Sequence, residues 1–188
     1  TAGKGVIHSE LPHPDFQERG GVMHGFQIWV NLPSKNKMMA PRYQDIPSSE
    51  IPTAISDDGL AEAKVIEGHC LGKSAIIDTV IPITYIHLTL HPSGRLEQQL
   101  SPELNAMIFC FRGSVNIGNR KLTDGQLGVL SEGDSVILSA PTDAEESTEL
   151  LLLAGPELDE PVARYGPFVM NTEKEISEAI FDYREGRL

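Results

Sequence analysis

A histidine and a glutamate one residue apart stand near the start of the chain and could together bind a metal ion. If residues 6–11 are extended, the side chains of His8 and Glu10 leave the same face of the strand, with their roots roughly 7 Å apart. An imidazole with a carboxylate suits a first-row transition metal better than Ca²⁺ or Mg²⁺, which prefer oxygen ligands. A lone His-x-Glu pair is more often a surface pair, so the motif alone favours a surface pair over a metal site.

The segment that would face this pair is residues 22–32, which alternate in the manner of a strand. Phe26 and Ile28 fall on one face and Gln27 on the other, and the run ends before Pro33. His24 shares the face of Phe26, where a half-buried, hydrogen-bonded histidine is favoured over a ligand. Gln27 and His24 are the candidates for lining a pocket beside the metal. Residues 12–21 between the two segments are expected to be a polar loop.

Three long stretches of the chain resemble one family. They are TAGKGVIHSELP, HGFQIWVNLPSKNKMMAPRYQ and GPFVMNTEKEISEAIFDYREG, and together they resemble the pirins, two-domain proteins of the cupin superfamily. The resemblance implies a mononuclear iron bound by three histidines and one glutamate in the N-terminal cupin. His8 and Glu10 correspond to two of these ligands. The other two belong to a His-x-His pair on an earlier strand, expected upstream of residue 1, since no His-x-His occurs in these residues.

The resemblance also implies an all-β bicupin fold, in which two β-barrels are followed by a C-terminal helix. Residues 1–40 would be the remainder of an N-terminal barrel that is incomplete in this sequence. A linker at 41–54 would follow, since its prolines interrupt regular structure, and 55–188 would form the C-terminal cupin. That second domain has neither a His-x-His nor a His-x-Glu pair, and is expected to hold no metal.

Short apolar runs separated by turns support a β-sandwich or barrel after residue 55. The expected strands lie at 63–67, at 76–90 in two runs broken by Pro82, and at 106–111, 114–117, 127–130, 135–138 and 150–154. The chain then predicts a helix packed on the barrel. Thr172 and Glu175 have capping-box spacing, an apolar stripe begins at Ile176, and Gly186 marks the end.

Two other motifs are set aside. Gly72-Lys73-Ser74 resembles the end of a phosphate-binding loop, but Glu67 stands where that motif needs its first glycine, and the next residues favour a strand over a helix. His87 and His91 share a strand face but would lie roughly 13 Å apart, too far to chelate one ion.

Composition limits the partners and the compartment. A formal charge of −12 argues against direct binding to nucleic acid, which requires a basic face. Cys70 and Cys110 are far apart in sequence and predict buried thiols in a reducing compartment. A single disulfide between them is the alternative. No apolar run is long enough to span a bilayer. Cytoplasm is the expected location, and nuclear entry is compatible with the sequence.

The resemblance implies two alternative functions. One is oxidation of a small aromatic substrate, a flavonol such as quercetin, by a 2,3-dioxygenase-type activity. His8 would then be a ligand, and Glu10 both a ligand and a proton acceptor. The other is an iron-dependent co-regulator that binds a protein partner, either a transcription-factor complex or a metabolic enzyme, without catalysis. An apolar slot beside the metal would favour the enzyme.

Overall fold

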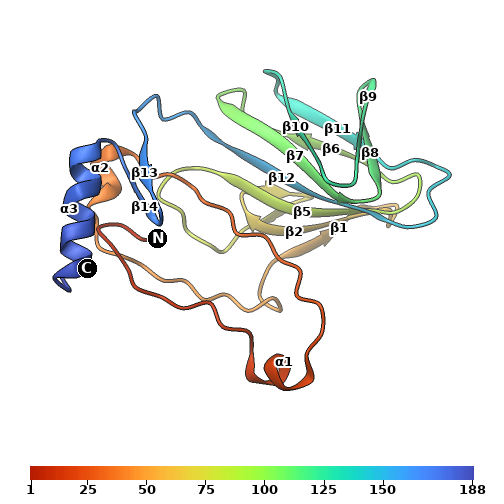
Figure 1. The fold of residues 1–188 in the computed structure, drawn as a ribbon. Coiled ribbons are helices and arrows are strands. Elements are labelled where there is room, and N and C mark those ends of the chain that lie inside the picture. The colour runs from red at the N-terminus through yellow and green to blue at the C-terminus, as the bar shows by residue number, and fades with distance from the viewer. The chain divides into compact units, whose positions relative to one another are not determined.

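The computed structural model describes all residues from Thr1 to Leu188 and divides into two compact units (Figure 1). One unit combines residues 1–43 with residues 158–188, and the other contains residues 44–157. The first boundary falls close to the start of the expected linker. The C-terminal helix belongs with the N-terminal segment and not with the sheets. No helix has both the length and the apolar character needed to cross a membrane.

Residues 44–157 form two antiparallel sheets that enclose an apolar core (Figure 1). The six-stranded sheet has the order β1 (Thr53–Ile55), β2 (Ala61–Glu67), β5 (Thr84–Leu90), β12 (Thr148–Pro156), β7 (Leu104–Arg112), β10 (Gln126–Val129). The four-stranded sheet has the order β6 (Arg95–Gln99), β11 (Ser135–Ser139), β8 (Ser114–Ile117), β9 (Arg120–Thr123). A small hairpin pairs β3 (His69–Cys70) with β4 (Lys73–Ser74).

The core follows from strict alternation along the strands. From Ala61 to Val65 in β2 and from Ile86 to Leu90 in β5 every second residue is fully buried, and the residues between them are partly exposed. Successive side chains of a strand point to opposite faces, so one face of each sheet supplies the core. The inward side chains include Val65, Ile86, Leu88, Ile108 and Leu152. The architecture is that of a cupin-type β-sandwich, as the sequence predicted, and most predicted strands lie within a few residues of their expected positions.

The other unit has little regular structure. It contains the helices α1 (Pro14–Arg19), α2 (Ser34–Lys37) and α3 (Glu173–Arg184), and a hairpin of β13 (Ala163–Tyr165) and β14 (Phe168–Met170). The α3 helix begins with the predicted capping box between Thr172 and Glu175. Its Tyr183 ring contacts the Phe168 ring edge-on, with centroids 6.1 Å apart. Within its unit, α3 packs on this hairpin.

Three local expectations also differ from the structure. Residues 6–11 and 22–32 are not strands, because no neighbouring strand pairs with their backbone, and the polar loop at 12–21 contains the short helix α1. Proline at the first turn and Asp15 near the positive end of the helix dipole favour that helix. Residues 76–83 also lie outside any strand. Of the two runs predicted at 76–90, only the second forms a strand, which is β5.

Candidate metal centre

His8 and Glu10 lie on the irregular segment before α1, and both side chains are exposed. Glu10 is held by one hydrogen bond, in which the Gln27 side-chain amide donates to Glu10 Oε1 over 2.7 Å. This contact brings together residues 17 positions apart in sequence. It places Gln27 beside the glutamate of the predicted pair, in the unit that contains both segments. A carboxylate oriented in this way by a neighbouring amide is typical of metal ligands.

Gln27 is itself held from its other side. The Trp29 indole N–H donates to Gln27 Oε1 over 3.2 Å. The guanidinium of Arg164, from β13, lies over the Trp29 ring with its central carbon 4.9 Å from the ring centroid. The predicted alternation placed Gln27 near the site and Trp29 on the same face two residues later, but it gave no indication of Arg164. A contact between an N-terminal segment and a C-terminal hairpin has no local signature.

His24, the second pocket candidate, lies against Phe26. The two rings have centroids 5.1 Å apart and are tilted by 59°. Both rings are on the same irregular segment as Gln27 and Trp29, and His24 is exposed. The segment therefore carries aromatic side chains close in sequence to the residue that contacts Glu10.

The donors present match part of a metal site. His8 offers an imidazole and Glu10 a carboxylate oriented by Gln27, two donor types that suit a first-row transition metal. No group of three or more histidine, cysteine, aspartate or glutamate side chains is arranged to hold a metal. His8 and Glu10 therefore supply two donor types for such a site and do not complete it.

A polar network fixes the segment that follows Trp29. Lys37 is almost fully buried and donates to Asn31 Oδ1 over 2.7 Å. Burial lowers the pKa of Lys37, and the nearby Glu160 and Glu175 oppose that shift. Glu160 accepts hydrogen bonds from the Ser34 backbone N–H and hydroxyl, at 2.7 and 3.0 Å. The network joins residues 31–37 to the segment before α3.

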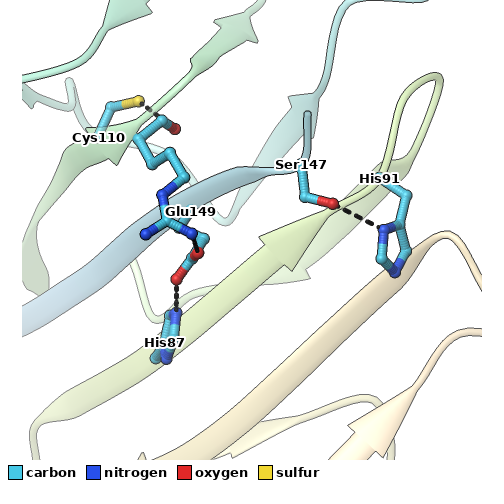
Figure 2. A network of polar contacts seen from close by, with 6 residues as sticks. His87, His91, Cys110, Ser147 and Glu149 are labelled. Atoms are coloured by element: carbon cyan, nitrogen blue, oxygen red, sulfur yellow. Dashed lines mark hydrogen bonds and ion pairs between the residues drawn. The ribbon is translucent and has the colours of Figure 1, made fainter. Parts of the chain in front are cut away.

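The polar side chains of the sandwich form a different arrangement (Figure 2). His87 on β5 contacts Glu149 on β12 over 3.2 Å, and Arg112 from the end of β7 pairs with the other oxygen of Glu149. His91 contacts Ser147 over 2.8 Å. The two histidines have separate partners, as expected for structural residues. Glu149 is satisfied by two opposite-charge or hydrogen-bonding neighbours, so this cluster needs no metal to balance it.

The cysteines and the discarded phosphate motif agree with the predictions. Cys70 and Cys110 are both free and buried in the sandwich core. Burial raises the pKa of Cys70 to about 11 and also raises that of Cys110. Such thiols stay protonated and unreactive near neutral pH. Lys73 and Ser74 lie on strand β4 and not at the start of a helix.

Residues 85–188, more than half of the chain, match the family described as the pirin C-terminal cupin domain. The chain belongs to the pirin family. It is 39% identical, over 99% of its length, to a Vibrio cholerae protein named "Putative quercetin 2,3-dioxygenase", of which it covers 64%. It is 38% identical, over its whole length, to human pirin, of which it covers 63%.

The fold of this pirin-family chain also matches a solved structure. A crystal structure of quercetin 2,3-dioxygenase from Acinetobacter baumannii superimposes over the entire chain with a TM-score of 0.92 and 35% identity. The chain covers 64% of that protein. It thus spans a little under two thirds of the length of these relatives.

Proposed function

We propose that this chain contributes His8 and Glu10 to a mononuclear non-haem iron centre that supports a quercetin 2,3-dioxygenase-type oxidation of a flavonol. The observation that carries the proposal is the Gln27 hydrogen bond to Glu10, which orients one carboxylate oxygen of the predicted pair. The names of the Vibrio relative and of the Acinetobacter structure support the choice of substrate class. Two further histidine ligands are expected from a segment that precedes these residues.

Each residue has a distinct role in this proposal. The iron, when bound, would supply a redox-active Lewis acid with open coordination positions. His8 serves as a neutral imidazole ligand. Glu10 would bind the metal and, on shifting away from it, would accept the proton of the flavonol hydroxyl as a general base. Gln27 donates to one oxygen of Glu10 and leaves the second oxygen for these tasks.

The aromatic residues of the same segment suit a flat, aromatic substrate. His24 and Phe26 present tilted rings 5.1 Å apart, and aromatic groups of a ligand pack favourably against such rings. We assign His24 and Gln27 to the pocket wall. In this role His24 contacts substrate and does not bind the metal.

Metal analysis and flavonol turnover test the proposal directly. The intact protein is expected to retain about one iron per chain and to consume a flavonol together with dioxygen, seen as loss of flavonol absorbance and as oxygen uptake. Both His8→Ala and Glu10→Gln should lose bound iron and lower turnover by about 100-fold or more. His13→Ala is the matched control, since His13 is exposed on the same segment, and it should behave as wild type. Wild-type protein without any bound metal would contradict the proposal.

The second candidate is an iron-dependent co-regulator that binds a protein partner. Its supporting observation is that large apolar side chains are exposed both beside His8 and Glu10, at Ile7 and Leu11, and on the segment of Gln27, at Val22 and Met23. Apolar surface of this kind marks contact regions. Bound iron without flavonol turnover, together with a partner affinity that depends on the iron's oxidation state, would favour the regulator. Such a protein would act in the cytoplasm or the nucleus.

A further inference from the structure

Four side chains form a continuous line of contacts that ends at Glu10. Arg164 lies over the Trp29 ring, the Trp29 indole N–H donates to Gln27, and the Gln27 amide donates to Glu10. The line crosses from hairpin β13–β14 to the segment that carries the candidate ligand. The proposed function uses only its last two members.

The chemistry of the indole fixes the direction of the line. A tryptophan Nε1–H can only donate, whereas a glutamine side chain has an accepting oxygen and a donating NH₂ that can exchange places by rotation. Because Trp29 donates to Oε1, the Gln27 NH₂ must point the other way, toward Glu10. With the amide reversed, its oxygen would face the carboxylate and repel it.

We infer that Trp29 and Arg164 are positioning residues for Glu10. Trp29 selects the orientation of the Gln27 amide that orients the carboxylate, and Arg164 holds the indole ring in place from β13. This inference rests on the proposed function, because it concerns the same metal ligand. Both residues act through another side chain and touch neither metal nor substrate.

The expected size of each effect follows from exposure. All four side chains are exposed, and Trp29 retains 53% of its accessible surface. Residues that orient a metal ligand typically change metal affinity by about 10- to 100-fold when replaced. A cation over an exposed aromatic ring contributes less stabilisation, so the loss of Arg164 should change metal affinity by about threefold. The loss of metal affinity should therefore be smaller for substitutions farther along the line from Glu10.

The test is the affinity of the intact protein for Fe²⁺, measured without oxygen by competition with a chromogenic chelator. The variant Trp29→Phe keeps an aromatic ring for Arg164 but removes the N–H, and its dissociation constant should rise about 10-fold. Arg164→Gln should raise the constant about threefold. Tyr165→Phe, at the neighbouring exposed position of β13, and Arg120→Gln, at an exposed arginine of the sandwich, are matched controls that should not change it.

A double-mutant cycle separates positioning from general structural damage. In a Gln27→Leu background, Trp29→Phe should weaken iron binding no further, because the group through which it acts is gone. Metal-free protein provides a second measurement. Trp29 is the single tryptophan, so its one indole N–H resonance should shift to lower frequency in Gln27→Leu.

The outcomes distinguish the two proposals. Wild-type protein that binds no iron would refute the proposed function and this role with it. Tight iron binding in wild type that is unchanged in Trp29→Phe would refute only the positioning role. The positioning role would also be overturned if the losses of iron affinity were additive in the double mutant, or if the indole N–H resonance did not move in Gln27→Leu.

Discussion

The two compact units differ in what they bury. In residues 44–157 the fully buried side chains are almost all apolar, and they come from both sheets. In residues 1–43 and 158–188 the buried residues are Pro33, Lys37, Ala163 and Ile176, one of which is charged. Burial of apolar surface stabilises the first unit, whereas hydrogen bonds and charge pairs around Lys37 and Glu160 connect the second.

The residues that stabilise the fold and the residues proposed to do chemistry lie in different units. The sandwich has filled its interior with aliphatic side chains, and its polar pairs, such as His87 with Glu149, are already satisfied. The candidate ligands His8 and Glu10 lie in the other unit, on segments without sheet pairing. A cupin interior can bind a metal only where polar side chains replace core residues. The proposed chemistry therefore belongs to the N-terminal segments, and the sandwich is expected to contribute a scaffold or a surface for a partner.

The largest expected effect is a cavity in the sandwich core. Leu152 has no exposed surface, so Leu152→Ala should lower the free energy of unfolding by about 3 kcal/mol, through lost burial and an unfilled cavity. The matched control is Leu127→Ala on β10, because Leu127 is 53% exposed, and it should change stability by less than about 0.5 kcal/mol. Urea unfolding measures both variants. Equal effects would contradict the assignment of the core.

A smaller effect is expected at the start of α3, in the other unit. The Thr172 hydroxyl accepts from the Glu175 backbone N–H over 3.2 Å, and the Glu175 carboxylate accepts from the Thr172 backbone N–H over 2.8 Å. Thr172→Ala should destabilise the helix by about 1 kcal/mol, seen as faster amide exchange in α3 with no change in the sandwich. Lys174→Ala, on the exposed first turn, should leave exchange unaltered. If exchange accelerated in both units, they would be one cooperative structure.

Glu67 in the sandwich and two glutamates in the other unit should respond to acid in opposite directions. In the sandwich, Glu67 has one buried oxygen without a hydrogen-bond partner. The Thr79 hydroxyl has a single hydrogen and lies closer to the Ile81 carbonyl, at 2.7 Å, than to Glu67, at 3.3 Å. Burial raises the pKa of Glu67, and nearby Asp78 adds to the shift. In the other unit, hydrogen bonds from Thr172 lower the pKa of Glu175, and those from Ser34 lower that of Glu160.

The sign of each effect follows from these directions. A raised pKa means that the folded state holds the proton more tightly, so Glu67 costs stability as the pH rises above the ordinary carboxyl range. Glu67→Gln should therefore stabilise the sandwich near pH 7 and give no gain at about pH 3. Glu175 and Glu160 stabilise their unit above that range, and this contribution is lost as the pH falls through their lowered values. Glu62→Gln on the same strand is the control, and a gain that persists at low pH would exclude titration of Glu67 as its cause.

The sequence predicted the sandwich better than it predicted the N-terminal unit, for a physical reason. Alternation of apolar residues along β2 and β5 records which face is buried, so strand positions follow from local pattern. Whether residues 22–32 become a strand depends on a hydrogen-bonding partner, which alternation cannot reveal. The pair His8 and Glu10 was visible as a motif, but the contact of Arg164 with Trp29 joins distant parts of the chain and left no pattern.

The smallest stability effect is expected on the exposed apolar surface of the N-terminal segments. Val22 is 93% exposed and Met23 is 72% exposed, so Val22→Ser with Met23→Ser should change the free energy of unfolding by less than about 0.5 kcal/mol. The same double variant should bind less of a dye that recognises exposed apolar surface when these 188 residues are studied alone, because contiguous apolar patches bind such ligands. Ser48→Ala with Ser49→Ala, two exposed serines of the other unit, provides the control for replacing two adjacent residues. If the serine substitutions at positions 22 and 23 instead destabilised the protein strongly, these side chains would be buried, and the contrast between a packed sandwich and an open N-terminal surface would fail.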